Sequence, residues 1–190
     1  MEKSKIKVIV GSVREKRFAM QPAEWIASEA KKLSEFEVEI LDLKDYPMPF
    51  FEEPVTPSYK TAPYTHPVVA EWTKKIAEAD GFIIVTAEYN HGYTAVLKNA
   101  LDYVYAEWHR KPVAFVGYGS VGGARAVEQL RQVAIELHMA PIRDAVHIVE
   151  YWNMLDEQGK LKTEALVKPA TTMLEQLMWW TKALKLARRS

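Results

Sequence analysis

Short apolar runs rich in β-branched residues recur along the chain and are separated by longer amphipathic stretches. The first run, Ile6 to Val10, is stopped by Gly11, and comparable runs follow at Phe82 to Val85 and at Val113 to Val116. Runs of this length without alternation are typical of strands buried on both faces of a sheet. The pattern therefore predicts three central strands.

Between these runs, apolar side chains return every three or four residues, which predicts one apolar stripe on each of several helices. The stripes are Val69, Trp72, Ile76 and Ala79; Leu97, Leu101, Val104 and Trp108; and Val127, Leu130, Ala134 and Leu137. Ile26, Ala30 and Leu33 predict a further helix after the first strand, and a last helix is expected around Thr163 to Leu186.

Two other segments have the pattern of edge strands. Glu37 to Leu43 alternates polar and apolar positions, and Ile142 to Ile148 contains Arg143 and Asp144. Both therefore predict strands that are partly exposed. The alternation of strands and helices predicts an α/β fold, with a parallel, doubly wound sheet and helices on both faces.

Residues 44–67 depart from this alternation. Six prolines lie in this segment, at positions 47, 49, 54, 57, 63 and 67, interleaved with Tyr46, Phe50, Phe51, Tyr59 and Tyr64. Loops longer than about 12–15 residues inside a compact domain are often functional. The aromatic content favours an ordered loop that packs on another surface.

Composition narrows the functional classes. The 190 residues are expected to form one domain, 1–190. The 25 acidic residues balance the 25 basic ones. A net charge of zero gives no reason to expect nucleic acid or anionic lipid as partners. The absence of cysteine excludes disulfides and thiolate sites, and no histidine has metal-ligand spacing. The charged N-terminus leads into an apolar run too short for a membrane span, so a cytoplasmic protein is expected.

The loop from Gly11 to Met20 follows the first strand and precedes a helix, which is a favourable place for a phosphate. Helix N-terminal amides offer N–H groups and partial positive charge, Ser12 offers a hydroxyl, and Arg14 and Arg17 offer charge-assisted bonds. The alternative is that Ser12 caps the helix. Because Val13 and Lys16 replace two glycines of the dinucleotide fingerprint, and because no G-x-x-x-x-G-K-S/T stretch exists, those two nucleotide folds are excluded.

Two further loops follow the next two central strands. Thr86 to Gly92 includes Tyr89 and can present backbone amides and a ring together, as a flat heteroaromatic ligand requires. Gly117 to Gly123 matches G-x-G-x-x-G, and its glycines would let the backbone approach a ligand. All three loops should meet at the carboxyl edge of the sheet. His91 is interpreted as a loop hydrogen-bonding residue rather than an acceptor-binding one.

The three loops together resemble the NADPH-dependent FMN reductase family, which includes quinone, azo-dye and chromate reductases. The resemblance rests on Gly11-Ser12-x-Arg14-x-x-Arg17, on Glu88-Tyr89-Asn90 with Leu97 to Asp102, and on Gly119-Ser120-x-Gly122-Gly123-x-Arg125-Ala126. It implies a flavodoxin-like sheet of five parallel strands in the order 2-1-3-4-5. The family usually has proline at the positions of Ala87 and Thr94; Thr94 can instead cap the following helix.

The resemblance also implies FMN as cofactor and NADPH or NADH as hydride donor. The residues expected at the FMN phosphate are Ser12, Arg14, Arg17, Phe18, Ala19 and Met20, and those around the flavin ring are Ala87, Glu88, Tyr89, Asn90, Gly119, Ser120 and Gly122. Lys98, Asn99 and Asp102 are interpreted as helix anchors and interface groups. No catalytic side chain is expected, because the hydride chemistry belongs to the cofactor.

The expected activity is hydride transfer from NAD(P)H through FMN to a quinone-like or other small acceptor. One alternative is an electron carrier or flavin-binding regulator without turnover, and another is a protein that binds a different phosphorylated ligand. The resemblance also implies a homodimer or a dimer of dimers, for which Trp108 and the aromatic loop 46–64 are candidate contacts.

Overall fold

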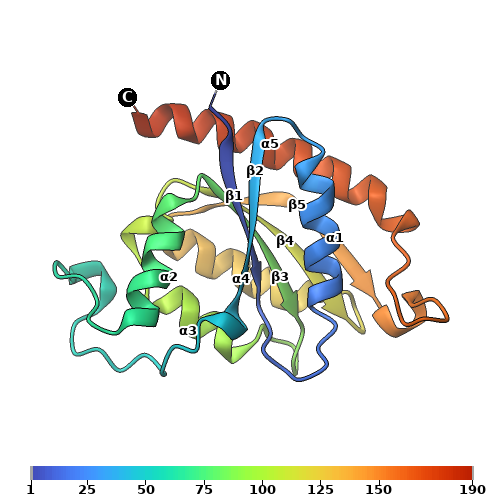
Figure 1. The fold of residues 1–190 in the computed structure, drawn as a ribbon, viewed down its shortest axis with the longest axis horizontal. Coiled ribbons are helices and arrows are strands. Elements are labelled where there is room, and N and C mark those ends of the chain that lie inside the picture. Colours follow the sequence, from blue (N-terminus) through green and yellow to red (C-terminus); the bar gives the residue numbers. More distant parts are fainter. Residues whose placement is uncertain (1, 190) are drawn as a thin grey trace.

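The computed structural model describes residues 2–189 and contains one sheet flanked by helices (Figure 1). The elements in chain order are β1 (Ser4–Val10), α1 (Met20–Lys31), β2 (Phe36–Asp42), α2 (Pro67–Glu78), β3 (Gly81–Ala87), α3 (Ala95–Asp102), β4 (Pro112–Gly119), α4 (Ala124–Glu136), β5 (Ala140–Val149) and α5 (Val167–Arg189). The sheet order is β2-β1-β3-β4-β5, and every pairing is parallel. The predicted fold and strand order are confirmed.

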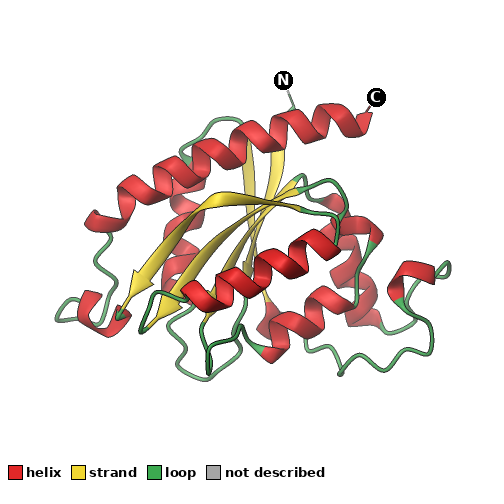
Figure 2. Ribbon diagram, turned by 180° about the vertical axis from the view of Figure 1, so that it is seen from behind, coloured by secondary structure: helices red, strands yellow, loops and turns green. Residues whose placement is uncertain are grey.

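Two apolar cores lie on opposite faces of the sheet. Helices α1 and α5 pack on one face through residues such as Ile26 and Leu177, and α2, α3 and α4 cover the other through residues such as Trp72 and Leu130. Figure 2, seen from behind, brings α4 to the front of the strands. All seven residues of β3 are buried because the strand has neighbours on both sides and helices on both faces.

The helical stripes fall where the periodicity places them, with one correction. The stripe Leu97 to Trp108 predicts a single helix, but α3 ends at Asp102 and Trp108 lies in a separate 3₁₀ turn, Ala106–Trp108. Trp108 is fully buried and packs edge-on against Phe82, so it belongs to the core. Because its side chain is fully buried, Trp108 is not available to contact a second subunit, and its prediction as a subunit contact is wrong.

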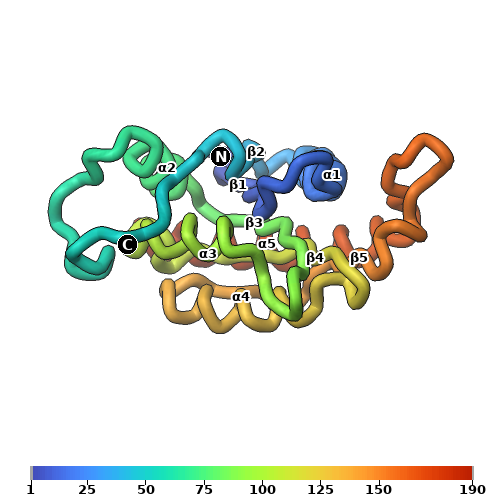
Figure 3. Tube along the Cα trace, turned by 90° about the horizontal axis from the view of Figure 1, so that it is seen from below, coloured from blue at the N-terminus to red at the C-terminus, as the bar shows by residue number. Residues whose placement is uncertain are grey.

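The strand register aligns the carboxyl ends of the central strands. Val10 pairs with Asp42 on one side and with Val85 on the other, and Ala87 pairs with Tyr118. The loops that begin at Gly11, Glu88 and Ser120 consequently emerge at one edge. Figure 3 views the molecule from that side, with segments 46–66 and 150–163 extending at opposite ends. Among the described residues, no helix has the length and hydropathy to cross a membrane.

Candidate functional site

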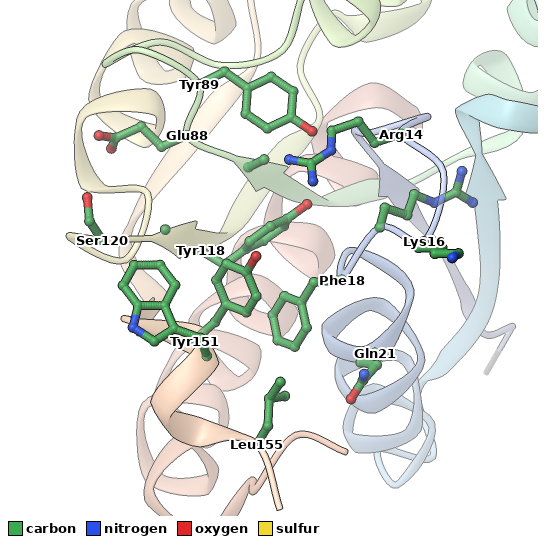
Figure 4. Close-up of a pocket in the computed structure, with 14 residues that line it drawn as sticks. Arg14, Lys16, Phe18, Gln21, Glu88, Tyr89, Tyr118, Ser120, Tyr151 and Leu155 are labelled. Atoms are coloured by element: carbon green, nitrogen blue, oxygen red, sulfur yellow. The ribbon is translucent and has the colours of Figure 1, made fainter. Parts of the chain in front are cut away.

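A cavity of about 440 Å³ opens at the carboxyl edge of the sheet (Figure 4). Its walls come from the loop after β1, the start of α1, the ends of β3 and β4 and the segment after β5. The lining residues are Arg14, Lys16, Arg17, Phe18, Gln21, Ala87, Glu88, Tyr89, Tyr118, Gly119, Ser120, Tyr151, Trp152 and Leu155. The volume lies in the range of about 300–1,000 Å³ that is usual for small-ligand sites.

The loop after β1 turns tightly at Gly11. The Gly11 N–H donates to the carbonyl of Val85 at 2.8 Å, and a Cβ at this position would stand only 2.9 Å from that same carbonyl oxygen. Glycine is therefore required for the chain to leave β1 against β3. This turn directs the following residues over the sheet edge towards the cavity.

Two cations of this loop lack a counter-charge within the protein. Arg14 and Lys16 are exposed, line the cavity, and have neither an ion pair nor a hydrogen bond with the described residues. The guanidinium of Arg14 lies 5.9 Å from the centre of the Tyr89 ring, and Figure 4 shows it reaching towards Tyr89 and Tyr118. Both cations remain available to an anionic ligand.

Arg17 is engaged differently. Its guanidinium forms an ion pair with Asp42 at the end of β2, and its side chain is only 9% exposed. The Nε of Arg17, however, is buried without a hydrogen-bond partner in the described structure. A buried donor with no acceptor is unfavourable unless a ligand or water completes it. Arg17 thus lines the cavity with a side chain that Asp42 already holds, and it is not a free cation.

The start of α1 adds one backbone donor to this region. Ala19 occupies the N-cap position and makes no side-chain capping bond. The Gln21 N–H donates to the Phe18 carbonyl at 3.0 Å and Pro22 has no N–H, so the Met20 N–H is the donor of the first turn without a partner among the described residues. The alternative that Ser12 caps this helix is wrong, because the buried hydroxyl of Ser12 is hydrogen-bonded to the hydroxyl of Tyr89 at 2.9 Å.

Glu88, the residue after β3, is held to α4 by its contacts with Arg125. Its carboxylate pairs with the guanidinium of Arg125 and accepts the Arg125 backbone N–H at 3.1 Å. Burial alone raises the pKa of this carboxyl, but the hydrogen bonds and charge of Arg125 outweigh it and hold the pKa below its usual value. Glu88 is therefore ionised and fixes the loop after β3 against the start of α4.

The tip of the loop after β3 is a tight turn. Asn90 and His91 have positive φ angles of 50° and 71°, and Tyr89 pairs with Gly92 in an isolated bridge. His91 Nε2 lies 2.8 Å from Arg125 Nη1, and the His91 carbonyl accepts from Gln129 at 3.0 Å. The interpretation of His91 as a loop hydrogen-bonding residue is confirmed, and His91 does not line the cavity.

The glycines after β4 shape the loop itself. Gly122 has φ +67°, and a Cβ there would lie 2.8 Å from the Cβ of His147 on β5. Gly123 is the N-cap of α4, also with a left-handed backbone. Gly122 packs against β5 and lies outside the cavity lining, so its role is to turn the chain from β4 into α4.

Several lining residues were not singled out from the sequence. Tyr118 is the penultimate residue of β4, and Tyr151 and Trp152 begin the 3₁₀ turn Tyr151–Met154 after β5. Phe18 stacks on Tyr151 with ring centres 4.4 Å apart and meets Tyr118 edge-on, which forms an aromatic wall. Burial raises the pKa of Tyr118 well above its usual value, so it keeps its proton. The adjacent aromatic residues Tyr151 and Trp152 could have been predicted as part of the site, because ligands in such folds bind beyond the carboxyl ends of the strands.

The thirteen residues expected to bind cofactor divide into two groups. Eight line the cavity: Arg14, Arg17, Phe18, Ala87, Glu88, Tyr89, Gly119 and Ser120. Five lie beside it or support it: Ser12, Ala19, Met20, Asn90 and Gly122. Among the described residues, no cluster of three or more His, Cys, Asp or Glu side chains is placed to hold a metal ion.

The donor set suits a phosphorylated, flat heteroaromatic ligand. The free cations Arg14 and Lys16 and the start of α1 lie at one end, while aromatic rings and strand-end backbone line the rest. Cations and backbone N–H groups bind phosphate, and aromatic side chains stack on a flat ring system. The residues present therefore fit a mononucleotide with an aromatic ring system.

Comparisons with known proteins agree with this geometry. Residues 4–153 match the family model described as NADPH-dependent FMN reductase. An NAD(P)H-dependent FMN reductase of Schizosaccharomyces pombe is 43% identical over 144 residues, which are 75% of this chain and 72% of that protein. A 2-hydroxy-1,4-benzoquinone reductase of Burkholderia sp. is 31% identical over 94% of this chain and 96% of its own length.

Solved structures show the same fold. The flavoenzyme NAD(P)H:(acceptor) oxidoreductase FerB from Paracoccus denitrificans superimposes with a TM-score of 0.73 at 20% sequence identity, over 95% of this chain and 98% of FerB. An apo NADH:FMN oxidoreductase superimposes with a TM-score of 0.67 at 16% identity, over 92% and 90% of the two chains. At these identities the likeness concerns the fold.

Proposed function

Because this chain belongs to the NADPH-dependent FMN reductase family, we propose that the cavity at the carboxyl edge of its sheet is the FMN site. The protein is an FMN-dependent NAD(P)H oxidoreductase that passes electrons to a quinone-like or other small acceptor. The family match over most of the chain favours turnover over the electron-carrier alternative. The identity of the residues that bind the cofactor is the part proposed here.

The phosphate end of the site is assigned to the loop after β1. Arg14 and Lys16 supply positive charge, and the Met20 N–H at the start of α1 supplies a hydrogen bond. Asp42 holds the Arg17 guanidinium in place beside the cavity, and the helix fixes the Met20 N–H, so both groups are pre-oriented. Pre-oriented donors bind an anion at less entropic cost than mobile side chains. The cavity-lining cations Arg14 and Lys16, which have no ion pair among the described residues, are the observation that carries the proposal.

The ring end of the site is assigned to the ends of β3 and β4. Glu88, Tyr89, Gly119 and Ser120 present backbone and side chains there, and Arg125 keeps this edge rigid through Glu88. Bound FMN supplies the hydride chemistry, for which the protein contributes binding and orientation. No side chain of the cavity is required as a general acid or base.

The proposal is tested by titrating the purified protein with FMN and with riboflavin, followed by anaerobic rapid mixing with NADPH. We expect FMN to bind more tightly than riboflavin, because only FMN carries the phosphate, and the visible flavin band to bleach on mixing. Equal affinity for both ligands would remove the phosphate assignment. Failure of the band to bleach with NADPH and with NADH would contradict the proposed turnover.

We further propose that residues 1–190 form one FMN-binding domain that assembles as a homodimer or a dimer of dimers. Both apolar cores pack on the same sheet, which supports one domain. In the aromatic loop 46–64, Phe50 is 78% and Tyr59 80% exposed, so both remain candidate contacts. A monomeric mass in light scattering at micromolar concentration would contradict the assembly.

A cytoplasmic location is part of the same proposal. The sequence has no cysteine and therefore no disulfide that would require an oxidising compartment. Fractionation of cells that produce the tagged protein tests it, and recovery of the protein in a membrane or secreted fraction would contradict it.

A further inference from the structure

A second cavity, of about 360 Å³, borders the cofactor cavity. Its lining comes from the loop after β1, from the long loop after β2 and from the first half of α3: Ser12, Val13, Arg14, Met48, Phe50, Tyr89, Thr94, Ala95, Val96 and Asn99. Arg14 and Tyr89 line both cavities, so their side chains form a shared wall. The function described above does not use this second cavity.

Apart from the guanidinium of Arg14, the polar side chains that line this cavity are already hydrogen-bonded within the protein. Ser12 is bonded to Tyr89, and Thr94 donates to the Gly11 carbonyl and accepts the Leu97 N–H. Asn99 Oδ1 accepts from the Phe51 N–H at 2.8 Å, and Asn99 Nδ2 donates to the Pro49 carbonyl at 2.7 Å. Beside the guanidinium of Arg14, the surface left for a ligand is the hydrocarbon of Val13, Met48, Phe50, Ala95 and Val96.

The cavity is also held in shape without a ligand. The two hydrogen bonds of Asn99 fix the main chain at 49–51 against α3, and the hydroxyl of Tyr103 adds bonds to the carbonyls of Pro49 at 3.1 Å and Phe50 at 3.3 Å. These contacts confirm Asn99 as an anchor between α3 and the rest of the chain. They hold the main chain that carries Phe50 in place at the cavity, and backbone that is already ordered lowers the ordering cost of binding.

We propose that this second cavity binds the alkyl substituent of a quinone acceptor whose ring reacts at the cofactor site. The inference rests on the proposed function and deepens it by naming the class of acceptor. The flavin ring, with its dimethylbenzene edge, is assigned to the first cavity, and NAD(P)H carries no alkyl chain, so the acceptor is the reactant that can place an alkyl chain here. Tyr89, assigned to the ring end of the cofactor site, lines both cavities and puts the second cavity beside the flavin ring.

The experiment compares an unsubstituted benzoquinone with a pentyl-substituted one in the FMN-loaded enzyme. Ala95→Phe fills the cavity from an exposed position on α3, and Ala70→Phe is the matched control, because Ala70 lines a separate cavity beside α2. Each methylene buried is worth about fourfold in affinity. We expect Ala95→Phe to lower kcat/KM for the pentyl quinone about tenfold or more, with no change for the parent quinone.

Phe50→Ala provides a second variant that does not depend on overfilling. Phe50 is 78% exposed, so its truncation leaves the core intact, but it removes one wall of the cavity. The same selective loss for the pentyl quinone, of several-fold, is expected. Loss for both quinones alike, or for neither, in the two variants would overturn the proposal.

A binding measurement without cofactor separates this inference from the proposed function. Saturation-transfer NMR with pentylbenzene and the FMN-free protein should show transfer of saturation from the protein to the methylenes of the pentyl group for the wild type and for Ala70→Phe. The transfer should be strongly reduced for Ala95→Phe. This readout survives even if the protein does not turn over NAD(P)H. Undiminished transfer in Ala95→Phe would overturn the proposal. A changed oligomeric mass of Ala95→Phe with unchanged selectivity between the two quinones would also overturn it, because that result would assign this surface to a second copy of the chain.

Discussion

The hydroxyl of Thr94, at the N-cap of α3, donates a hydrogen bond to the carbonyl of Gly11, the residue that follows β1. The same oxygen accepts the Leu97 N–H at 3.2 Å, so the expectation that Thr94 caps the helix is confirmed. One buried side chain therefore couples the loop proposed to hold the phosphate to the helix beyond the ring-binding loop. Proline, which the family commonly has here, lacks a hydroxyl to make either bond.

Replacing Thr94 with valine should destabilise the protein by about 1–2 kcal/mol, because a helix cap and a buried hydrogen bond are both lost. It should also weaken FMN binding, since the turn at Gly11 loses its support. Thr94→Ser, which keeps the hydroxyl, serves as the control. Denaturant unfolding measures the first effect and FMN titration the second; a valine variant as stable as the serine one would contradict the coupling.

Arg14→Ala and Lys16→Ala should each weaken FMN binding by about tenfold, because a charge-assisted contact to phosphate is worth roughly 1.4 kcal/mol or more. Affinity for riboflavin should stay unchanged, since it carries no phosphate. Arg143→Ala is the control, because its side chain is 93% exposed on β5, away from the cavity. Fluorescence titration with both ligands measures the difference, and parallel losses for FMN and riboflavin would argue against a phosphate contact.

Gly122→Ala and Gly159→Ala separate backbone strain from steric clash. Both glycines have φ near +70°, but a Cβ at Gly159 meets nothing within 4 Å, whereas one at Gly122 would lie 2.8 Å from the Cβ of His147. Gly159→Ala should cost about 1–2 kcal/mol for the left-handed backbone alone. Gly122→Ala should cost a further ~1–3 kcal/mol for overpacking. Equal unfolding free energies for the two variants would contradict this.

Lys111 should make the protein more stable as the pH rises from about 8 to about 10.5. Burial lowers the pKa of its ammonium from 10.5 to about 8, while the group donates to the carbonyls of Ile76 and Ala77 at the end of α2. Between these two pH values the unfolded chain binds a proton that the folded chain lacks, so raising the pH favours folding. Below about pH 8 both states are protonated and the unfavourable contribution is constant.

The Lys111 effect is isolated by comparing the wild type with Lys111→Met across this pH window. The difference in unfolding free energy between them should change by up to about 3 kcal/mol, at about 1.4 kcal/mol for each pKa unit. The exposed Lys168→Met is the control and should show no such change. A difference that is flat between pH 8 and pH 10.5 would show that Lys111 titrates normally in the folded state.

The sequence by itself determined the strands, the order of the helices and the edge of the sheet where the site lies. Short runs rich in β-branched residues, such as Ile6 to Val10, predict strands that are buried on both faces, and the apolar side chains of the helical stripes are buried as their periodicity predicts. Loops that follow parallel strands must gather at one edge. These features depend on local periodicity, which a single sequence displays directly.

Only the tertiary structure decided which polar groups are free to bind. Arg14 and Arg17 look alike in the sequence, but Asp42, distant along the chain, pairs with Arg17 and leaves Arg14 and Lys16 unpaired. In the same way, Tyr89 engages Ser12, and Tyr151 joins Phe18 from the far end of the sheet. Such partners are set by the packing of distant segments, and a side chain's charge or hydroxyl is available to a ligand only where that packing leaves it unmatched.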